Sequence, residues 1–197
     1  MHGERTSSRE RCTECARDVT AEQHLRHLAV SVQRVRIPRL DAVLAAFPGA
    51  LINLELKPTA GAFAGALVAL LRDARALDRV CLGSEDDAVA ASLVEHAPDA
   101  CHFYPREALT ALIMAIRSGE PAPREERFHL LDMPFELAGI PLVDRTLIDR
   151  VEELRRWVNV WTVDAPADMR ALIALGVDGI MTDRPDVLRV ELDAAQR

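Results

Sequence analysis

The chain has 197 residues, and 49% of them are hydrophobic, which is enough to fill one sizeable core and excludes a wholly disordered protein. The formal net charge is −7, from 24 basic and 31 acidic side chains, so bulk attraction to nucleic acid or to anionic membranes is not expected. An anionic small molecule would need a local positive site.

The start of the chain and its hydropathy predict a cytosolic protein. The longest apolar stretch, residues 62–71, is about half of the ~20 residues that a membrane-spanning helix needs. The first residues are charged from Glu4 onward and lack the apolar core of a secretion signal. We therefore expect no membrane span, and we expect the four cysteines to be reduced thiols.

From Ile37 onward, helical and strand-like segments alternate. A helix is expected over residues 39–47, after Pro38 and before Pro48-Gly49. The expected segments that follow are strand 50–56, helix 63–77, strand 79–83, helix 86–96, strand 100–103, helix 106–117, strand 128–133 and helix 144–156.

The last part of the chain contains the clearest β-α-β unit. Strand 158–163 is followed by a helix that begins at Asp164 and Pro166 and ends at Gly176, then by strand 177–181 and a final helix. Strands separated by single helices favour a parallel α/β sheet. The pattern alone fits both a doubly wound sheet and a (β/α)8 barrel, and the absence of a glycine-rich fingerprint argues against a dinucleotide fold.

A polar stripe on the first strand is the strongest local indication of a site. Asn53, Glu55 and Lys57, the only lysine of the chain, point to one side of the strand, while apolar residues point to the other. Charges on a buried strand are costly unless they are paired or used. Glu55 and Lys57 therefore form either an ion pair with no further role or, as we favour, part of a site at the carboxyl end of the strand.

Four segments resemble the glycerophosphodiester phosphodiesterase family. The family ends in a Trp-Thr-Val strand, then Gly-Val-Asp-Gly-Ile and Thr-Asp-Arg-Pro, and the block from Val158 to Pro185 is similar to this signature. Its Ile-Pro-Thr-Leu helix and Glu-x-Lys strand are similar to IPRLDAVLAAFPGALINLELKP. The segments RVCLGSEDD and FHLLDMP fall between these two in the same order as in the family, so the resemblance covers about residues 37–190.

The resemblance implies a TIM (β/α)8 barrel that hydrolyses glycerophosphodiesters to glycerol 3-phosphate and an alcohol. Family members hold a divalent metal, Mg or Ca, with three carboxylates and use two histidines for acid-base work. Glu55 matches the third metal-binding carboxylate, Lys57 the lysine beside the substrate phosphate, and Trp161 the aromatic residue at the mouth of the site. A cation and a lysine would together offset the phosphate charge. The alternative for Trp161 is ordinary barrel packing.

The family's first two strands, with their His-Arg-Gly, Pro-Glu-Asn and Glu-x-Asp motifs, have no counterpart here. We therefore predict a partial barrel over residues 37–197 that lacks its first two strands, preceded by an arm, residues 1–36. The arm is interpreted as a remnant of the region after the second strand. In this interpretation His2 matches a catalytic histidine, and the alternative is that it belongs to a disordered terminus.

The missing motifs leave two hypotheses open for function. One of three carboxylates cannot hold Mg or Ca tightly, so the chain is either an enzyme with incomplete machinery or a non-catalytic barrel fragment that binds or oligomerises. Two open sheet edges would also need covering, by the arm, by further chain or by a second copy. A homo-oligomer is therefore predicted as one solution.

The arm offers a rival metal site. Cys12, Cys15, His24 and His27 are four zinc-type ligands within sixteen residues, although their spacing differs from that of the usual finger. The alternative is an exposed helix on which the two histidines lie one turn apart.

Five further residues receive structural interpretations. Ser84 is expected to cap a helix rather than act as a nucleophile, and Arg106 is expected to stabilise a loop rather than reach a phosphate. His129 is expected to be a hydrogen-bonded core residue, with a place facing the barrel mouth as the alternative. Cys81 and Cys101 are expected to be small core residues.

Overall fold

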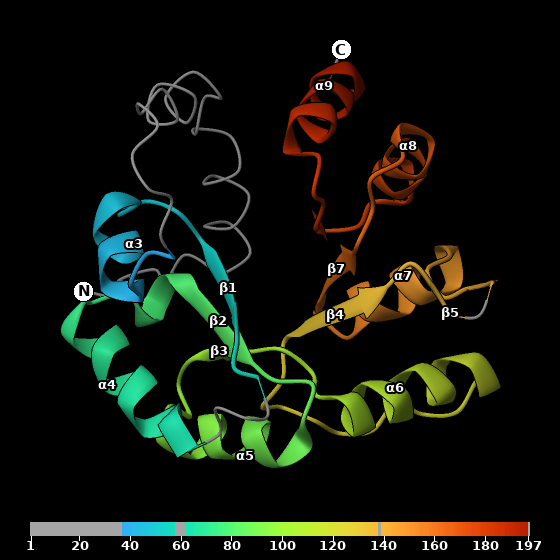
Figure 1. Ribbon diagram of the computed structural model, residues 1–197. Coiled ribbons are helices and arrows are strands. Elements are labelled where there is room, and N and C mark those ends of the chain that lie inside the picture. Colours follow the sequence, from blue (N-terminus) through green and yellow to red (C-terminus); the bar gives the residue numbers. More distant parts are fainter. Residues whose placement is uncertain (1–36, 58–61, 138, 197) are drawn as a thin grey trace, which may run out of the picture.

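The fold is built on six parallel strands in a computed structural model that describes residues 37–57, 62–137 and 139–196 (Figure 1). A parallel bridge between Phe103 and Leu130 links the first three strands to the last three, so the strands follow one another in chain order. The strands are β1 (Ile52–Glu55), β2 (Val80–Gly83), β3 (Cys101–His102), β4 (Leu130–Pro134), β7 (Trp157–Trp161) and β8 (Gly179–Ile180).

Helices alternate with these strands, as the sequence predicts. In the described part of the chain, α5 packs on β2 and α7 on β7. The helices are α3 (Leu40–Ala46), α4 (Ala64–Asp73), α5 (Asp87–His96), α6 (Arg106–Ser118), α7 (Arg145–Glu153), α8 (Pro166–Leu175) and α9 (Pro185–Ala195), with a short 3-10 helix, η2 (Leu77–Arg79), before β2.

Local chemistry sets the ends of several helices. The Asp86 carboxylate accepts a hydrogen bond from the Val89 amide at 3.0 Å, and the Asp144 carboxylate accepts one from the Leu147 amide at 2.9 Å. Gly176 follows α8 with φ 87°, in the left-handed region that a side chain would disfavour. Asp86 and Asp144 thus cap the starts of α5 and α7, and Gly176 caps the end of α8.

The core is divided between the two halves of the sheet. The larger cluster lies between β4, β7 and the helices α6 to α8, and the smaller one lies between β1, β2 and the helices α3 and α4. Fully buried side chains of the larger cluster include Leu131, Met133, Leu147, Val160 and Leu172, and those of the smaller one include Val68, Leu71 and Leu82.

The strand order decides between the two folds that the sequence pattern leaves open. A doubly wound sheet reverses its strand order at a switch point, whereas a barrel adds each new strand beside the last one. The order here shows no reversal. Among the described residues, β1 pairs only with β2 and β8 only with β7, so these strands form an open array and not a closed barrel. That two strands of a barrel are missing stays a prediction.

The structure departs from the predicted elements in two places. The first strand was predicted to be buried, but exposed residues alternate with half-buried ones along β1, because β1 has a described partner on one side only. A hairpin of β5 (Glu136–Leu137) and β6 (Ile140–Pro141) follows β4 and was not predicted.

No helix in the described ranges has the length and apolar character that crossing a membrane requires.

Candidate active site

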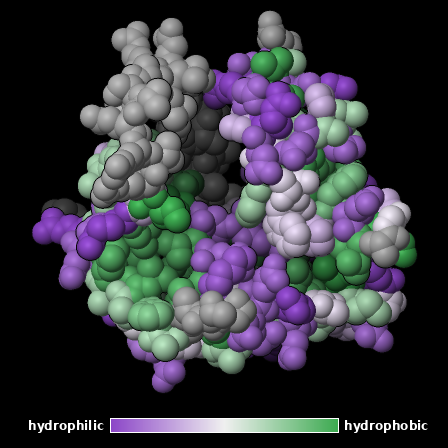
Figure 2. All heavy atoms as spheres, viewed as in Figure 1, coloured by the Kyte–Doolittle hydropathy of each residue, from purple (hydrophilic) through white to green (hydrophobic). Residues whose placement is uncertain are grey.

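The carboxyl ends of the strands open into a cavity of about 1160 Å³. Glu55 and Lys57 from β1 and its end line this cavity together with Trp161 at the end of β7. Figure 2 shows hydrophilic residues gathered in the middle of one face, between the two halves of the sheet. The structure thus brings Trp161 into the same cavity as Glu55 and Lys57, which lie more than 100 positions earlier in the chain.

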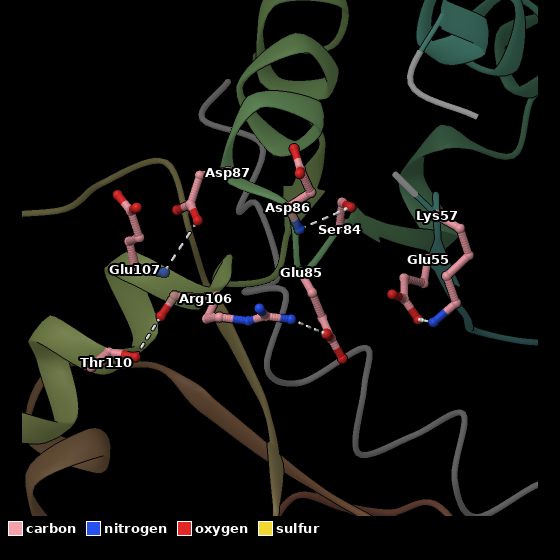
Figure 3. A network of polar contacts seen from close by, with 9 residues as sticks. All are labelled: Glu55, Lys57, Ser84, Glu85, Asp86, Asp87, Arg106, Glu107 and Thr110. Atoms are coloured by element: carbon pink, nitrogen blue, oxygen red, sulfur yellow. Dashed lines mark hydrogen bonds and ion pairs between the residues drawn. The ribbon is translucent and has the colours of Figure 1, made fainter. Parts of the chain in front are cut away.

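Glu55 and Lys57 form an ion pair at the rim of the cavity (Figure 3). The Lys57 Nζ donates to Glu55 Oε2 at 2.5 Å. The hydrogen bond to Glu55 is the main cause that raises the pKa of Lys57, and the charge of Glu85 adds to it. The Lys57 side chain is 65% exposed, so water screens the ion pair and the free energy of the interaction is small. An incoming anion could therefore compete for the ammonium group.

A second ion pair lies in the same cavity. Arg106, the first residue of α6, donates to Glu85 Oε2 at 2.8 Å, and both side chains are exposed. Figure 3 shows the Arg106 guanidinium extended towards Glu85, which lies on the side of Glu55 and Lys57. The contact ties the start of α6 to the loop after β2, as expected for a residue that stabilises a loop. It also places a second cation at the rim.

Asp132 is a partly buried carboxyl group that the sequence patterns did not single out. It lies on β4, where its two oxygens accept hydrogen bonds from the Asn53 amide at 2.5 Å and the Asn159 amide at 3.1 Å. Its pKa is raised to about 6, chiefly by burial; the two amide hydrogen bonds oppose this rise, and the charge of Glu55 adds to it. This side chain lines the same cavity as Glu55.

The residues of the C-terminal signature shape the opposite rim. The Asp164 carboxylate accepts hydrogen bonds from the Thr182 hydroxyl at 2.8 Å and from the Asp183 amide at 2.9 Å. The loop after β7 is thereby fixed to the loop after β8. Thr182 and Asp183 line the cavity beside Trp161, so the signature has a structural role at the site.

The described residues do not fit a site with three metal-binding carboxylates. Among them, no group of three or more histidine, cysteine or acidic side chains lies close enough to hold an ion. The Glu55 carboxylate contacts Lys57, and the Asp132 carboxylate contacts two amides. Glu55 alone therefore represents the predicted ligand set in this part of the chain.

Several predicted site residues lie outside the described residues. These are His2, which was predicted to be catalytic, and the four candidate zinc ligands Cys12, Cys15, His24 and His27. Their predicted roles stay predictions.

The remaining histidine and cysteine predictions concern a second cavity, of about 530 Å³, at the amino ends of the strands. His129 lines this cavity and not the one at the carboxyl ends of the strands, and its buried Nδ1 has no hydrogen-bond partner among the described residues. Cys81 and Cys101 line it too. They are partly exposed, so their prediction as core residues was wrong, because their side chains line this cavity instead of packing in a core cluster.

The predicted cap at Ser84 was also wrong. Ser84 is fully buried, and its hydroxyl accepts a hydrogen bond from the Asp86 amide at 3.2 Å. Asp86 is the residue that caps α5, because its side chain reaches the free amide in the first turn.

Comparison with known proteins identifies the family. The model of the glycerophosphoryl diester phosphodiesterase family matches residues 3–187. The chain belongs to this family. The Mycobacterium tuberculosis protein named "Probable glycerophosphodiester phosphodiesterase 2" is 29% identical over 160 residues, which cover 78% of this chain and 59% of that protein.

Solved structures of the family have the same fold. A protein from Silicibacter pomeroyi named as a "Putative glycerophosphoryl diester phosphodiesterase" is 27% identical and superposes with a TM-score of 0.59, over 79% of this chain and 55% of its own. An Oleispira antarctica phosphodiesterase, 15% identical, superposes with a TM-score of 0.55 over 77% of this chain and 58% of its own, and its structure contains the product sn-glycerol-3-phosphate. The chain thus spans less than two thirds of the length of these relatives.

Proposed function

We propose that this chain acts as a glycerophosphodiester phosphodiesterase that releases glycerol 3-phosphate and an alcohol. The observation that carries the proposal is the meeting of Glu55, Lys57 and Trp161 in one cavity at the carboxyl ends of the strands, where barrel enzymes place their sites. Family membership supports the reaction, and so does the product bound by the Oleispira antarctica relative.

The charges of the cavity suit a phosphodiester. The Lys57 ammonium is the exposed positive group beside Glu55, and it can leave its weak surface pair to contact the phosphate. Arg106 adds a second positive charge at the rim. Trp161 offers an apolar face for the carbon chain of the glycerol unit. We therefore assign Lys57 and Trp161 to substrate binding.

Glu55 is proposed as a ligand of a divalent metal, Mg or Ca. A hard cation takes several carboxylate and carbonyl oxygens, and the described residues offer too few of them around Glu55. The other ligands would have to come from outside the described residues. For the same reason we assign no reaction step to the metal.

The experiment that tests the function is an assay for glycerol 3-phosphate. The purified chain is incubated with glycerophosphocholine and with glycerophosphoethanolamine, each with Mg, with Ca, or with a chelator. We expect release that depends on the metal and is lost in Glu55→Gln, while Glu95→Gln, a change at an exposed carboxylate on α5, has no effect. A folded chain that releases nothing under all conditions would contradict the proposal.

The second candidate is a non-catalytic barrel fragment. It is favoured by the absence of a carboxylate cluster from the part of the chain that the structure describes. Such a protein would bind sn-glycerol-3-phosphate without turning over a diester, which calorimetry would detect in the same samples. Its role in lipid metabolism, its cytosolic location and its proposed self-association stay predictions.

A further inference from the structure

Two cysteines face each other across neighbouring strands. Cys81 of β2 is the direct register partner of Cys101 of β3. The Cys101 thiol donates to the Cys81 sulfur, and the two Sγ atoms are 2.6 Å apart. Neighbouring strands lie ~4.8 Å apart, which is within the ~4.4–6.8 Å that a disulfide requires between its Cα atoms. A bond between the sulfurs thus needs no rearrangement of the strands.

The same two thiols can be reached by small molecules. Both side chains are partly exposed, and both line the cavity of about 530 Å³ at the amino ends of the strands. A volume of this size is typical of pockets that admit small ligands. The cavity that contains Glu55 and Lys57 has neither cysteine in its lining, so the cysteine pair is separate from the proposed hydrolase site.

We propose that Cys81 and Cys101 are a redox-active pair that forms a disulfide within the chain. The oxidant is a small-molecule disulfide such as oxidised glutathione. One cysteine thiolate attacks a sulfur of the oxidant, breaks its S–S bond and releases one thiol, which leaves a mixed disulfide on the protein.

The second cysteine then completes the exchange. Its thiolate attacks the protein sulfur of the mixed disulfide, forms the Sγ–Sγ bond and releases the second thiol. In the sum, the two cysteines lose two electrons and two protons, and the two sulfurs of the oxidant gain them. The close approach of the two Sγ atoms favours this intramolecular step over attack by a second external thiol.

The disulfide would have a defined effect on stability. It would join β2 to β3 and close a loop that contains α5. A cross-link of this kind restricts the unfolded chain more than the folded one, in which the two strands already lie side by side. The oxidised protein should therefore melt at a higher temperature than the reduced protein.

The sequence makes the bond easy to detect. Cleavage by trypsin after Arg79 and Arg106 yields one peptide, residues 80–106, with both of these cysteines and no others, whereas Cys12 and Cys15 fall in a different tryptic peptide. The full chain is equilibrated with defined ratios of reduced and oxidised glutathione, alkylated, and digested without reduction. We expect the 80–106 peptide to carry no alkyl group and to be lighter by two hydrogen atoms, about 2 Da, until dithiothreitol restores it.

Single substitutions supply the control. Cys101→Ser should leave Cys81 as a mixed disulfide with glutathione and should abolish the rise in Tm on oxidation; Cys81→Ser should do the same at Cys101. If the wild-type peptide carries two alkyl groups or two glutathione groups at every ratio, or if the bond forms only between two molecules, the proposal is wrong. None of these outcomes depends on hydrolase activity.

Discussion

Asp132 shows how a single side chain can link both halves of the sheet. Its carboxyl group accepts one hydrogen bond from the side-chain amide of Asn53 on β1 and one from that of Asn159 on β7. It therefore contacts one strand from each of the two larger core clusters. Each hydrogen bond to a charged group stabilises the ionised carboxylate, but burial and the charge of Glu55 oppose ionisation more strongly. The balance makes this residue sensitive to pH in the mildly acidic range.

A pH series on Asp132→Asn tests that balance. The pKa of Asp132 is raised to about 6 in the folded state, above its usual 3.8, so the folded state binds the proton more tightly than the unfolded state does. The wild-type protein should lose stability, relative to the Asn variant, as the pH rises from about 4 to about 6, and the difference should then level off. The total loss in the free energy of unfolding is at most about 3 kcal/mol, because the pKa rises from 3.8 to about 6 and each unit of pKa change is worth ~1.4 kcal/mol.

Urea unfolding of both proteins at a series of pH values measures this difference. A Glu95→Gln protein, changed at an exposed carboxylate on α5, should run parallel to the wild type. A constant gap between Asp132→Asn and wild type across the range would show that Asp132 keeps an ordinary pKa.

Lys57 is the residue through which the proposed binding of phosphate is best tested. Lys57→Gln removes the exposed ammonium beside Glu55 and should weaken the binding of sn-glycerol-3-phosphate by about tenfold or more, since a charge-assisted hydrogen bond is worth ~1.5–3 kcal/mol. Arg145→Gln, which removes an exposed charge from α7, is the matched control. Calorimetric titration gives both affinities, and equal losses would argue against a local role for Lys57.

At the scale of single residues, the sequence indicates Glu55 and Lys57 but misses Asp132, for a physical reason. Glu55 and Lys57 could be found because a strand places alternate residues on one side. Asp132 could not, since its partners Asn53 and Asn159 lie 79 and 27 positions away and nothing in the segment LLDMP pairs it with them. The one available signal was a charged residue within an apolar strand.

At the scale of elements, one arginine joins the first described helix to the sheet. The Arg79 guanidinium, just before β2, donates to the carbonyl oxygens of Leu44, Phe47 and Ala50 at 2.9 to 3.0 Å. These groups lie in and after the last turn of α3, where carbonyls lack helical partners. A side chain with several fixed donors satisfies them together and ties the end of α3 to the start of β2.

Arg79→Lys should therefore destabilise the fold although it keeps the charge. A lysine carries its donors on one nitrogen and cannot span three carbonyls that two guanidinium nitrogens reach, so we expect a loss of about 1–3 kcal/mol in the free energy of unfolding. Arg75→Lys, at an exposed position after α4, is the control and should change it by less than about 0.5 kcal/mol. Chemical denaturation monitored by circular dichroism compares the two variants, and equal midpoints would contradict the role given to Arg79.

Helices and strands were predictable where local signals are strong. Asp86, Asp144 and Gly176 mark helix ends by chemistry that acts within a few residues, and the structure confirms those ends to within a few positions. The β5–β6 hairpin has only two residues in each strand, and both strands are exposed. It has no apolar alternation to detect, and its pairing becomes visible only in three dimensions.

At the scale of the whole molecule, the sheet has two strand edges that no described strand covers. In the described ranges, β1 and β8 each present one side without a strand partner. Free backbone groups along a strand edge readily pair with another chain. The family relatives are longer than this chain, and in a closed barrel such edges would not exist.

We predict that the chain associates through these edges unless other segments cover them. Light scattering after size exclusion should then show a mass that rises with protein concentration, above the 21.8 kDa of one chain. Asn53→Pro removes a backbone donor on the side of β1 that faces away from β2 and should lower the association, whereas Arg124→Pro, in the exposed loop after α6, should not. A constant monomer mass at all concentrations would refute the prediction.

The composition of the chain allows the candidate site to be labelled selectively. Lys57 is the only lysine in the sequence, and its side chain is 65% exposed at the rim of the cavity. Acylating reagents that spare arginine will therefore mark, besides the α-amino group, this one position. Occupancy of the cavity by any ligand becomes readable as slower acylation in intact-mass spectra, without turnover and without engineering a probe into the protein.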